Sequence, residues 1–251
     1  KEITNFMHNH LNVPPNALKY VLFQRTEYLF FRRSRVLQWL KFHLPKRLSE
    51  VLETLFTKFD FMVSIEAFFR SHEIIHLFNE AMKTEYSEMK RFLPTEAKDI
   101  GAGIGGIDLF LARHFEKDRP SIYVLDKTEM PQKVYYGIRD QACFYNSLEL
   151  SREFLKANGV SNEKIVTLEA NEKNNIPSEG PFDVIVSLIS WGFHYPVSTY
   201  VDDVYQKLSP DGVLILDVRK GEGGMEALKN RFKTVEIIRD EVKHSRVAAR
   251  K

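Results

Sequence analysis

The sequence of 251 residues predicts an α/β fold, in which a largely parallel sheet with helices on both faces follows an all-helical N-terminal region. In the first 92 residues, apolar positions recur at helical spacing and no strand pattern intrudes. From about residue 97 onward, short β-rich runs alternate with helical stretches, which is typical of strand–helix–strand units. The first of these runs leads directly into a glycine-rich loop, a common junction between a strand and the next helix.

The N-terminal region is expected to be helical over three stretches, 18–40, 48–56 and 65–89, with breaks at Pro14-Pro15 and at Pro45. We place the boundary of this region after residue 92. Residues 1–92 are expected to cap the substrate site, and residues 93–251 are expected to form the ligand-binding domain.

Seven strands are expected in the second region, which fits one α/β layer. They are predicted at 97–100, 121–125, 164–168, 182–188, 212–218, 234–238 and 246–249, and the last two resemble a terminal strand pair. Helices are predicted at 107–115 and 147–158, the second of them stopped by Gly159.

The composition is that of a soluble globular protein, with 43% hydrophobic and 28% charged residues. The longest apolar stretch, 182–189, is well short of the roughly 20 residues that span a membrane. The single cysteine, Cys143, cannot form an internal disulfide, and no basic-then-apolar secretory leader is present. We therefore expect a cytoplasmic protein without a membrane span.

The net charge of +2 hides a basic segment between residues 11 and 48, where eight basic residues face the single acid Glu27. Aromatic side chains are interleaved with these charges. Such a segment suits nucleic acid, an anionic membrane surface or an acidic substrate. The alternative is an amphipathic helix pair whose aromatics face the core and whose charges are solvated.

The glycine loop that follows the first strand fits two motifs. Gly101, Gly103 and Gly106 satisfy the dinucleotide-binding spacing G-x-G-x-x-G, whereas Asp99, Gly101, Gly103 and Gly105 satisfy the spacing D-x-G-x-G-x-G. Close glycines let the backbone approach a ligand and aim helix N–H groups at it. An acid at the end of the second strand, Asp126, accepts ribose hydroxyls in either case, so the loop alone leaves both cofactors open.

The downstream pattern distinguishes the two motifs. The segment Pro181-Phe182-Asp183-Val184-Ile185-Val186-Ser187, a helix ending in Lys207-Leu208-Ser209-Pro210-Asp211-Gly212 and the strand 213–217 resemble a Rossmann-like class I S-adenosylmethionine-dependent methyltransferase. The resemblance spans about 97–251 and implies a seven-stranded sheet with S-adenosylmethionine as cofactor. It also implies a set of cofactor-binding residues: Asp99, Gly101, Ala102, Gly103, Gly105, Asp126, Lys127, Glu169, Ala170, Asn171 and Ser187.

The segment after the fourth strand faces the transferable methyl group in that family, and here it reads Ser-Trp-Gly-Phe-His-Tyr-Pro over 190–196. The Asn-Pro-Pro-Tyr type of motif found in many base and amide N-methyltransferases is absent. Trp191 and Tyr195 are expected to line the substrate site next to the methyl group, because aromatic faces attract the positively charged sulfonium of the cofactor. His194 is the expected general base, because a hydroxyl acceptor must lose its proton as the new bond forms.

Three further positions and one motif complete the expected substrate site. Tyr136 and Arg139 lie in the long connection after Asp126, and Arg219 ends the fifth strand, where it faces an anionic substrate group or solvent. His72 and His76 spell H-E-x-x-H on a predicted helix, a zinc-protease pattern. No Gly-x-x-His follows it, so we expect no metal and instead a substrate contact from one of these histidines or solvated helix positions.

Together these features predict a methyltransferase that modifies a small-molecule acceptor, at oxygen rather than nitrogen, for example a sugar, a glycan precursor or a secondary metabolite. A nucleic-acid partner is not expected, whereas a homodimer is an open possibility. One alternative is an RNA methyltransferase that binds phosphates through the basic segment. Another is a catalytically inactive binding module with the same fold.

Overall fold

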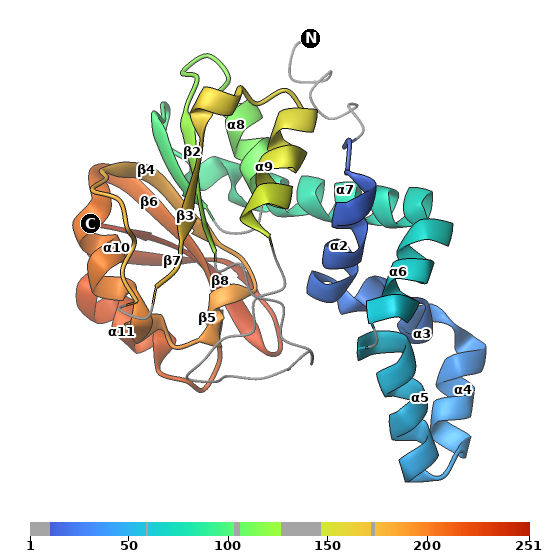
Figure 1. The fold of residues 1–251 in the computed structure, drawn as a ribbon. Coiled ribbons are helices and arrows are strands. Elements are labelled where there is room, and N and C mark those ends of the chain that lie inside the picture. The colour runs from blue at the N-terminus through green and yellow to red at the C-terminus, as the bar shows by residue number, and fades with distance from the viewer. Residues whose placement is uncertain (1–10, 59, 103–105, 127–146, 172–173) are drawn as a thin grey trace.

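A computed structural model describes residues 11–58, 60–102, 106–126, 147–171 and 174–251 (Figure 1). Seven strands form one sheet in the order β3-β2-β1-β4-β6-β8-β7, in which β8 runs antiparallel to β6 and to β7 while the other pairs are parallel. The strands are β1 (Asp99–Ala102), β2 (Ser121–Asp126), β3 (Ile165–Glu169), β4 (Phe182–Ser187), β6 (Leu208–Arg219), β7 (Thr234–Asp240) and β8 (His244–Arg250). The predicted seven-stranded sheet with its terminal strand pair is confirmed.

A further strand, β5 (Ser190–Tyr195), lies where the sequence suggested a loop. It runs beside β6 and does not join the order of the seven-stranded sheet. Gly192 has a φ of +84°, and a Cβ there would lie 2.6 Å from the carbonyl oxygen of Asp217. Only glycine therefore allows β5 to approach β6 this closely.

Helices cover both faces of the sheet, as the sequence predicted. Along β2, Ile122 and Val124 face one hydrophobic core, whereas Tyr123 and Leu125 face the other. The first face is covered by α8 (Gly106–His114) and α9 (Leu148–Ala157), and the second by α10 (Val201–Lys207) and α11 (Gly224–Arg231). The sequence had anticipated α8, α9 and the end of α10, but not α11.

The N-terminal region is helical, as predicted, but two of the three expected helices, 18–40 and 65–89, are divided into shorter ones. It contains α2 (Leu18–Gln24), α3 (Phe30–Arg33), α4 (Arg35–His43), α5 (Lys46–Lys58), α6 (Asp60–Phe69) and α7 (Ser71–Met89). The expected helix 18–40 is broken twice, between 25 and 29 and at Ser34. The Ser34 hydroxyl accepts a hydrogen bond from the Leu37 N–H (3.3 Å), which caps the start of α4.

The N-terminal helices lie on the α8 face of the sheet (Figure 1). Buried residues of α2 and α7 belong to the same core cluster as those of α8, α9 and the sheet. Gly106 begins α8 directly against α7, where a Cβ would lie 2.6 Å from the Met82 sulfur. The boundary predicted after residue 92 therefore does not separate two hydrophobic cores.

No helix in the described part of the chain is long and apolar enough to cross a bilayer.

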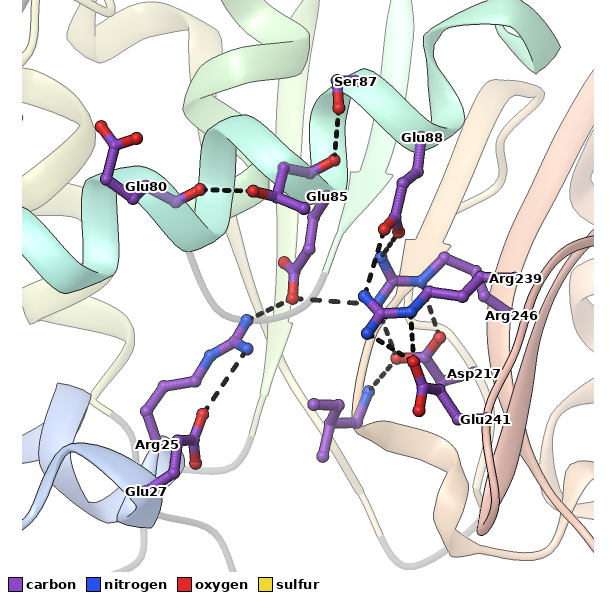
Figure 2. A network of polar contacts seen from close by, with 12 residues as sticks. Arg25, Glu27, Glu80, Glu85, Ser87, Glu88, Asp217, Arg239, Glu241 and Arg246 are labelled. Carbon is purple, nitrogen blue, oxygen red and sulfur yellow. Dashed lines mark hydrogen bonds and ion pairs between the residues drawn. The ribbon is translucent and has the colours of Figure 1, made fainter. Parts of the chain in front are cut away.

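A buried polar network joins α7 to the sheet (Figure 2). The Arg246 guanidinium on β8 donates two hydrogen bonds to the Asp217 carboxylate on β6, at 2.8 and 3.0 Å. The same guanidinium lies 3.1 Å from Glu88 and 3.7 Å from Glu85, both on α7. Glu85 in turn accepts a 2.6 Å hydrogen bond from Arg25 at the end of α2. Five charged groups thus connect two helices with two strands.

The network keeps its charges although it is buried. Asp217 is fully buried and Arg246 is 3% exposed. Burial alone would lower the pKa of Arg246, but the Asp217 carboxylate, Glu85 and Glu88 offset this effect and raise that pKa. Arg246 therefore stays cationic, and loss of one partner would leave an uncompensated charge in the core.

We expect Arg246→Met to lower the free energy of unfolding by about 3–5 kcal/mol, the cost of breaking a buried ion pair by removing one partner. Arg239→Met is the matched control, because Arg239 contacts Glu88 from a half-exposed position. This control is expected to cost at most about 1 kcal/mol. Urea denaturation of both variants provides the comparison, and equal losses would contradict the role given to burial.

Candidate functional site

A cavity opens on the α10 face of the sheet, near the carboxyl ends of the first four strands. It encloses about 740 Å³ of empty space, part of it open to solvent. Its lining comes from β1 to β5, from the segment before β4 and from α10: Gly101, Tyr123, Leu125, Asp126, Leu168, Ala170, Ile176, Phe182, Ile185, Val186, Ser187, Ser190, Trp191, Tyr195, Tyr200 and Val204. In parallel sheets of this kind, ligands bind beyond the carboxyl ends of the strands.

The cavity brings together four of the predicted cofactor residues. Gly101 lies on β1, Asp126 ends β2, Ala170 follows β3 and Ser187 ends β4. The Ala170 N–H donates a 2.8 Å hydrogen bond to the Asp126 carbonyl oxygen, which fixes the ends of β2 and β3 relative to each other. These residues come together because the three strand ends β2, β1 and β4 are consecutive neighbours in the sheet.

Aromatic side chains from β5 and from the start of α10 form part of the cavity wall. The Trp191 indole N–H donates to the carbonyl of Val197 (3.1 Å), and the indole ring packs edge-on against Tyr200, with ring centroids 5.9 Å apart. Burial raises the pKa of Tyr200, and the negative charges of Asp126 and Asp203 raise it further. Tyr200 therefore remains a neutral hydroxyl donor near Asp126 at physiological pH.

The segment 174–181 closes one side of the cavity without a helix of its own. The Ile176 N–H donates to the Asp203 carboxylate (2.6 Å), and the Lys207 ammonium donates to the Ile176 carbonyl (2.5 Å). Lys207 and Asp203, one turn apart on α10, also form an ion pair at 2.9 Å. Helix α10 thus holds the Ile176 side chain in the cavity wall through both of its backbone polar groups.

The turn between β4 and β5 connects the cavity to the buried network. The Ser187 hydroxyl accepts a hydrogen bond from the Trp191 N–H (3.1 Å). Two residues before Trp191, the Ile189 N–H donates to the Asp217 carboxylate (3.1 Å), and Ile189 has a φ of +52°. Such a conformation is unfavourable for a β-branched residue, so surrounding contacts must fix it. Asp217 provides one of these contacts.

Asp99, predicted at the cofactor, begins β1 and does not line the cavity. The N–H groups of Lys98 and Asp99 donate to the Asp183 carboxylate, which joins the starts of β1 and β4. Burial raises the pKa of Tyr123, and a hydrogen bond and the charge of Asp99 contribute to the shift. Asp99 thus lies next to Tyr123, a residue of the cavity wall.

Several predicted residues lie away from the lining of this cavity. Glu169 and Asn171 are exposed at the end of β3. His194 lies on β5, where its ring packs edge-on against Phe193 (centroids 5.0 Å apart). The Arg219 guanidinium lies over the Phe193 ring, 5.2 Å from the ring centroid. Trp191 and Tyr195 are the predicted substrate residues that do line the cavity.

The N-terminal helices contribute none of the described side chains that line the cavity. His72 and His76 are exposed on α7, on the opposite face of the sheet. The expected cap over the site is therefore not seen in residues 11–58 and 60–92. Among the described residues, no group of three His, Cys, Asp or Glu side chains is placed to hold a metal ion.

Five predicted site residues lie outside the described residues: Gly103, Gly105, Lys127, Tyr136 and Arg139. Ala102 ends β1, next to the glycine loop. The structure also adds residues that the sequence reasoning missed, above all Tyr200 and Ile176. Neither belongs to a motif. Ile176 follows β3 and Tyr200 begins a short helix after β5, and such positions in a sequence usually belong to the core. They line the cavity instead because the described residues 174–181, ahead of β4, form no helix.

No family model and no curated protein matches this sequence. Solved structures with a similar arrangement include a precorrin-6y C5,15-methyltransferase from Geobacter metallireducens, with 17% identity, coverage of 69% of this chain and 88% of that chain, and a TM-score of 0.44. A methyltransferase from Pyrococcus furiosus has 19% identity, coverage of 67% and 82%, and a TM-score of 0.45. An rRNA methylase from Streptococcus thermophilus has 14% identity, coverage of 67% and 94%, and a TM-score of 0.44.

Proposed function

We propose that this chain is an S-adenosylmethionine-dependent methyltransferase that acts on a small-molecule acceptor. One observation carries the proposal: residues that the sequence motifs assign to the cofactor, from the ends of β1, β2, β3 and β4, line one cavity. Its lining is mostly apolar and aromatic with a few polar groups, which is typical of small-molecule sites. The alternative of a binding module without activity would leave this convergence of motif residues without a purpose.

The residues present fit the adenosyl part of that cofactor. Asp126 has two carboxylate oxygens at the end of β2, suited to accept hydrogen bonds from two ribose hydroxyls. Leu125, Leu168 and Ala170 offer an apolar surface for an adenine ring. When bound, the cofactor supplies an electrophilic methyl group on a sulfonium. The chain's own task is then to orient the acceptor and exclude water.

The lining favours an acceptor without phosphate groups. Among the described side chains that line the cavity, Asp126 is the single charged one, and the remainder are apolar, aromatic or hydroxylic. A nucleic-acid acceptor would need cations at its phosphates. We therefore propose an uncharged acceptor with a ring or hydroxyl groups, held against Trp191 and Tyr195, with methylation at oxygen. The domain division at residue 92 is part of this proposal, with ligand binding confined to residues 93–251.

We further propose His194 as the general base. It lies on β5 and is adjacent in sequence to Tyr195, which lines the cavity. A hydroxyl loses its proton as the methyl group is transferred, and a neutral imidazole accepts a proton near neutral pH. Arg219 packs on Phe193 and supports the position of this segment.

The cofactor is tested by Asp126→Ala. Loss of a charged acceptor of hydrogen bonds costs about 1.5–3 kcal/mol, so we expect the Kd for S-adenosylmethionine to rise about 10- to 150-fold in titration calorimetry. Asp202→Ala, at an exposed carboxylate on α10, is the control and should leave the Kd unchanged. Tight binding of NAD together with no binding of the sulfonium cofactor would contradict the assignment.

The base is tested by His194→Ala, with His72→Ala and His76→Ala on exposed positions of α7 as controls. We expect kcat to fall by about 10²–10⁴ while the cofactor Kd stays unchanged. The kcat of the parent enzyme should fall at acid pH because the imidazole is protonated. The pH profile of the variant should lack this fall. Release of S-adenosylhomocysteine with a panel of hydroxylated acceptors gives the rates. A normal kcat and pH profile in His194→Ala would remove this residue from the mechanism.

A further inference from the structure

Helices α4 and α5 form an antiparallel hairpin that projects away from the sheet and from the cavity (Figure 1). The inner residues of the hairpin are Leu37, Leu40 and Leu44 on α4, and Leu52 and Phe56 on α5. The outer surface carries six exposed apolar side chains: Val36, Trp39, Phe42, Leu48, Val51 and Leu55. Of these, Phe42 is 86% exposed and Val36 is 67% exposed. A soluble protein rarely leaves a contiguous apolar surface of this kind without a function.

The exposed apolar residues form one stripe on each helix. Each residue turns about 100° around a helix axis, so Val36, Trp39 and His43 line up on α4. The Trp39 and His43 rings stack with centroids 4.3 Å apart, which confirms this alignment. On α5, the spacing of Leu48, Val51 and Leu55 gives a second stripe.

Both stripes fall on the same side of the hairpin. In α4 the stripe is turned by about 100° from the inner face, in the direction opposite to the turn of the helix, and in α5 it is turned by about 90° in the same sense. Because the two helices are antiparallel, similar rotations of equal sense bring both stripes to one side. The hairpin therefore has one apolar side, which includes Trp39 near its tip.

The charges on the hairpin and on the short helix before it are predominantly positive. Residues 30–58 contain seven basic residues and two acids, Glu50 and Glu53. Arg32 and Lys41 pair with Glu53, and Arg33 lies 3.4 Å from Glu73. Within the described chain, Arg35, Lys46 and Arg47 form no ion pair and are exposed, at the start of α4 and at the turn into α5.

We propose that the α4–α5 hairpin is a docking surface for an anionic lipid bilayer, with the apolar side in the headgroup boundary and Arg35, Lys46 and Arg47 on lipid phosphates. An apolar side with Trp, Phe and Leu, flanked by unpaired cations, matches the chemistry of interfacial helices. A second copy of this chain would bring like charges together, whereas anionic lipids neutralise them. The inference does not depend on the proposed methyl transfer.

The test uses the full chain with vesicles of phosphatidylcholine that contain about one third phosphatidylserine. We expect the chain to sediment with these vesicles, weakly or not at all with pure phosphatidylcholine, and less as salt rises. Lys46→Glu combined with Arg47→Glu should weaken binding at least about 25-fold, at about fivefold for each cation removed. The matched charge control is Lys229→Glu with Lys233→Glu, at exposed positions near α11, which should bind like the parent.

Insertion has a fluorescence signature of its own. The chain has two tryptophans, and Trp191 is 7% exposed whereas Trp39 is 58% exposed. A blue shift on vesicle addition should therefore come from Trp39 and be lost in Trp39→Phe, which keeps binding. Trp39→Ser with Phe42→Ser should abolish binding, while Ile237→Ser with Val242→Ser, two exposed apolar residues elsewhere, should not.

Three outcomes would overturn the inference. The first is equal binding to neutral and anionic vesicles, or binding to neither. The second is a dimer in solution that Trp39→Ser with Phe42→Ser dissociates, since the surface would then be an interface between copies. The third is a preference for RNA over vesicles that is abolished by Lys46→Glu with Arg47→Glu, which would assign the cations to a nucleic acid.

Discussion

The buried ion pair between Arg246 and Asp217 constrains more of this structure than any other contact. It joins Asp217 on β6 to Arg246 on β8, and the Arg246 guanidinium also contacts Glu85 and Glu88 on α7. Asp217 also accepts the N–H of Ile189, so the conformation of the turn after β4 depends on the same carboxylate. A buried charge is costly unless all its partners are in place, which makes the relative positions of α7, strands β6 and β8, and the turn mutually dependent.

The two faces of the sheet have different tasks. The face under α8 and α9 is fully covered, and the N-terminal helices extend its core. On the other face, α10 and α11 cover β4, β6 and β8, whereas the described residues 174–181, ahead of β4, form no helix. Tyr123, Leu125 and Leu168 on β2 and β3 are therefore only partly buried, and the cavity lies over them. Within the described residues, the site thus lies over the two strands that α10 and α11 leave partly uncovered.

The helical hairpin and the cavity lie in different parts of the molecule, and each has its own proposed function: membrane docking for the hairpin and methyl transfer for the cavity. The hairpin is joined to the core through α6 and α7, and it projects away from the sheet. Exposed aromatic side chains lower solubility, and a partner surface that buries them removes this disadvantage. In the arrangement proposed above, the sheet domain would lie beside a membrane surface with its cavity still open to solvent.

The sequence by itself determined the layer order, seven sheet strands and the convergence of Gly101, Asp126, Ala170 and Ser187, because strand periodicity and strand-end motifs are local signals. It predicted less of the site than of the fold. Strand β5 was expected as a loop, and the break at Ser34 was missed, since a serine cap is weaker than a proline. Only tertiary structure decided which face the N-terminal helices cover, that Tyr200 and Ile176 wall the cavity, and that Arg246 meets Asp217. These contacts join residues far apart in the chain, and their geometry depends on packing that no local pattern encodes.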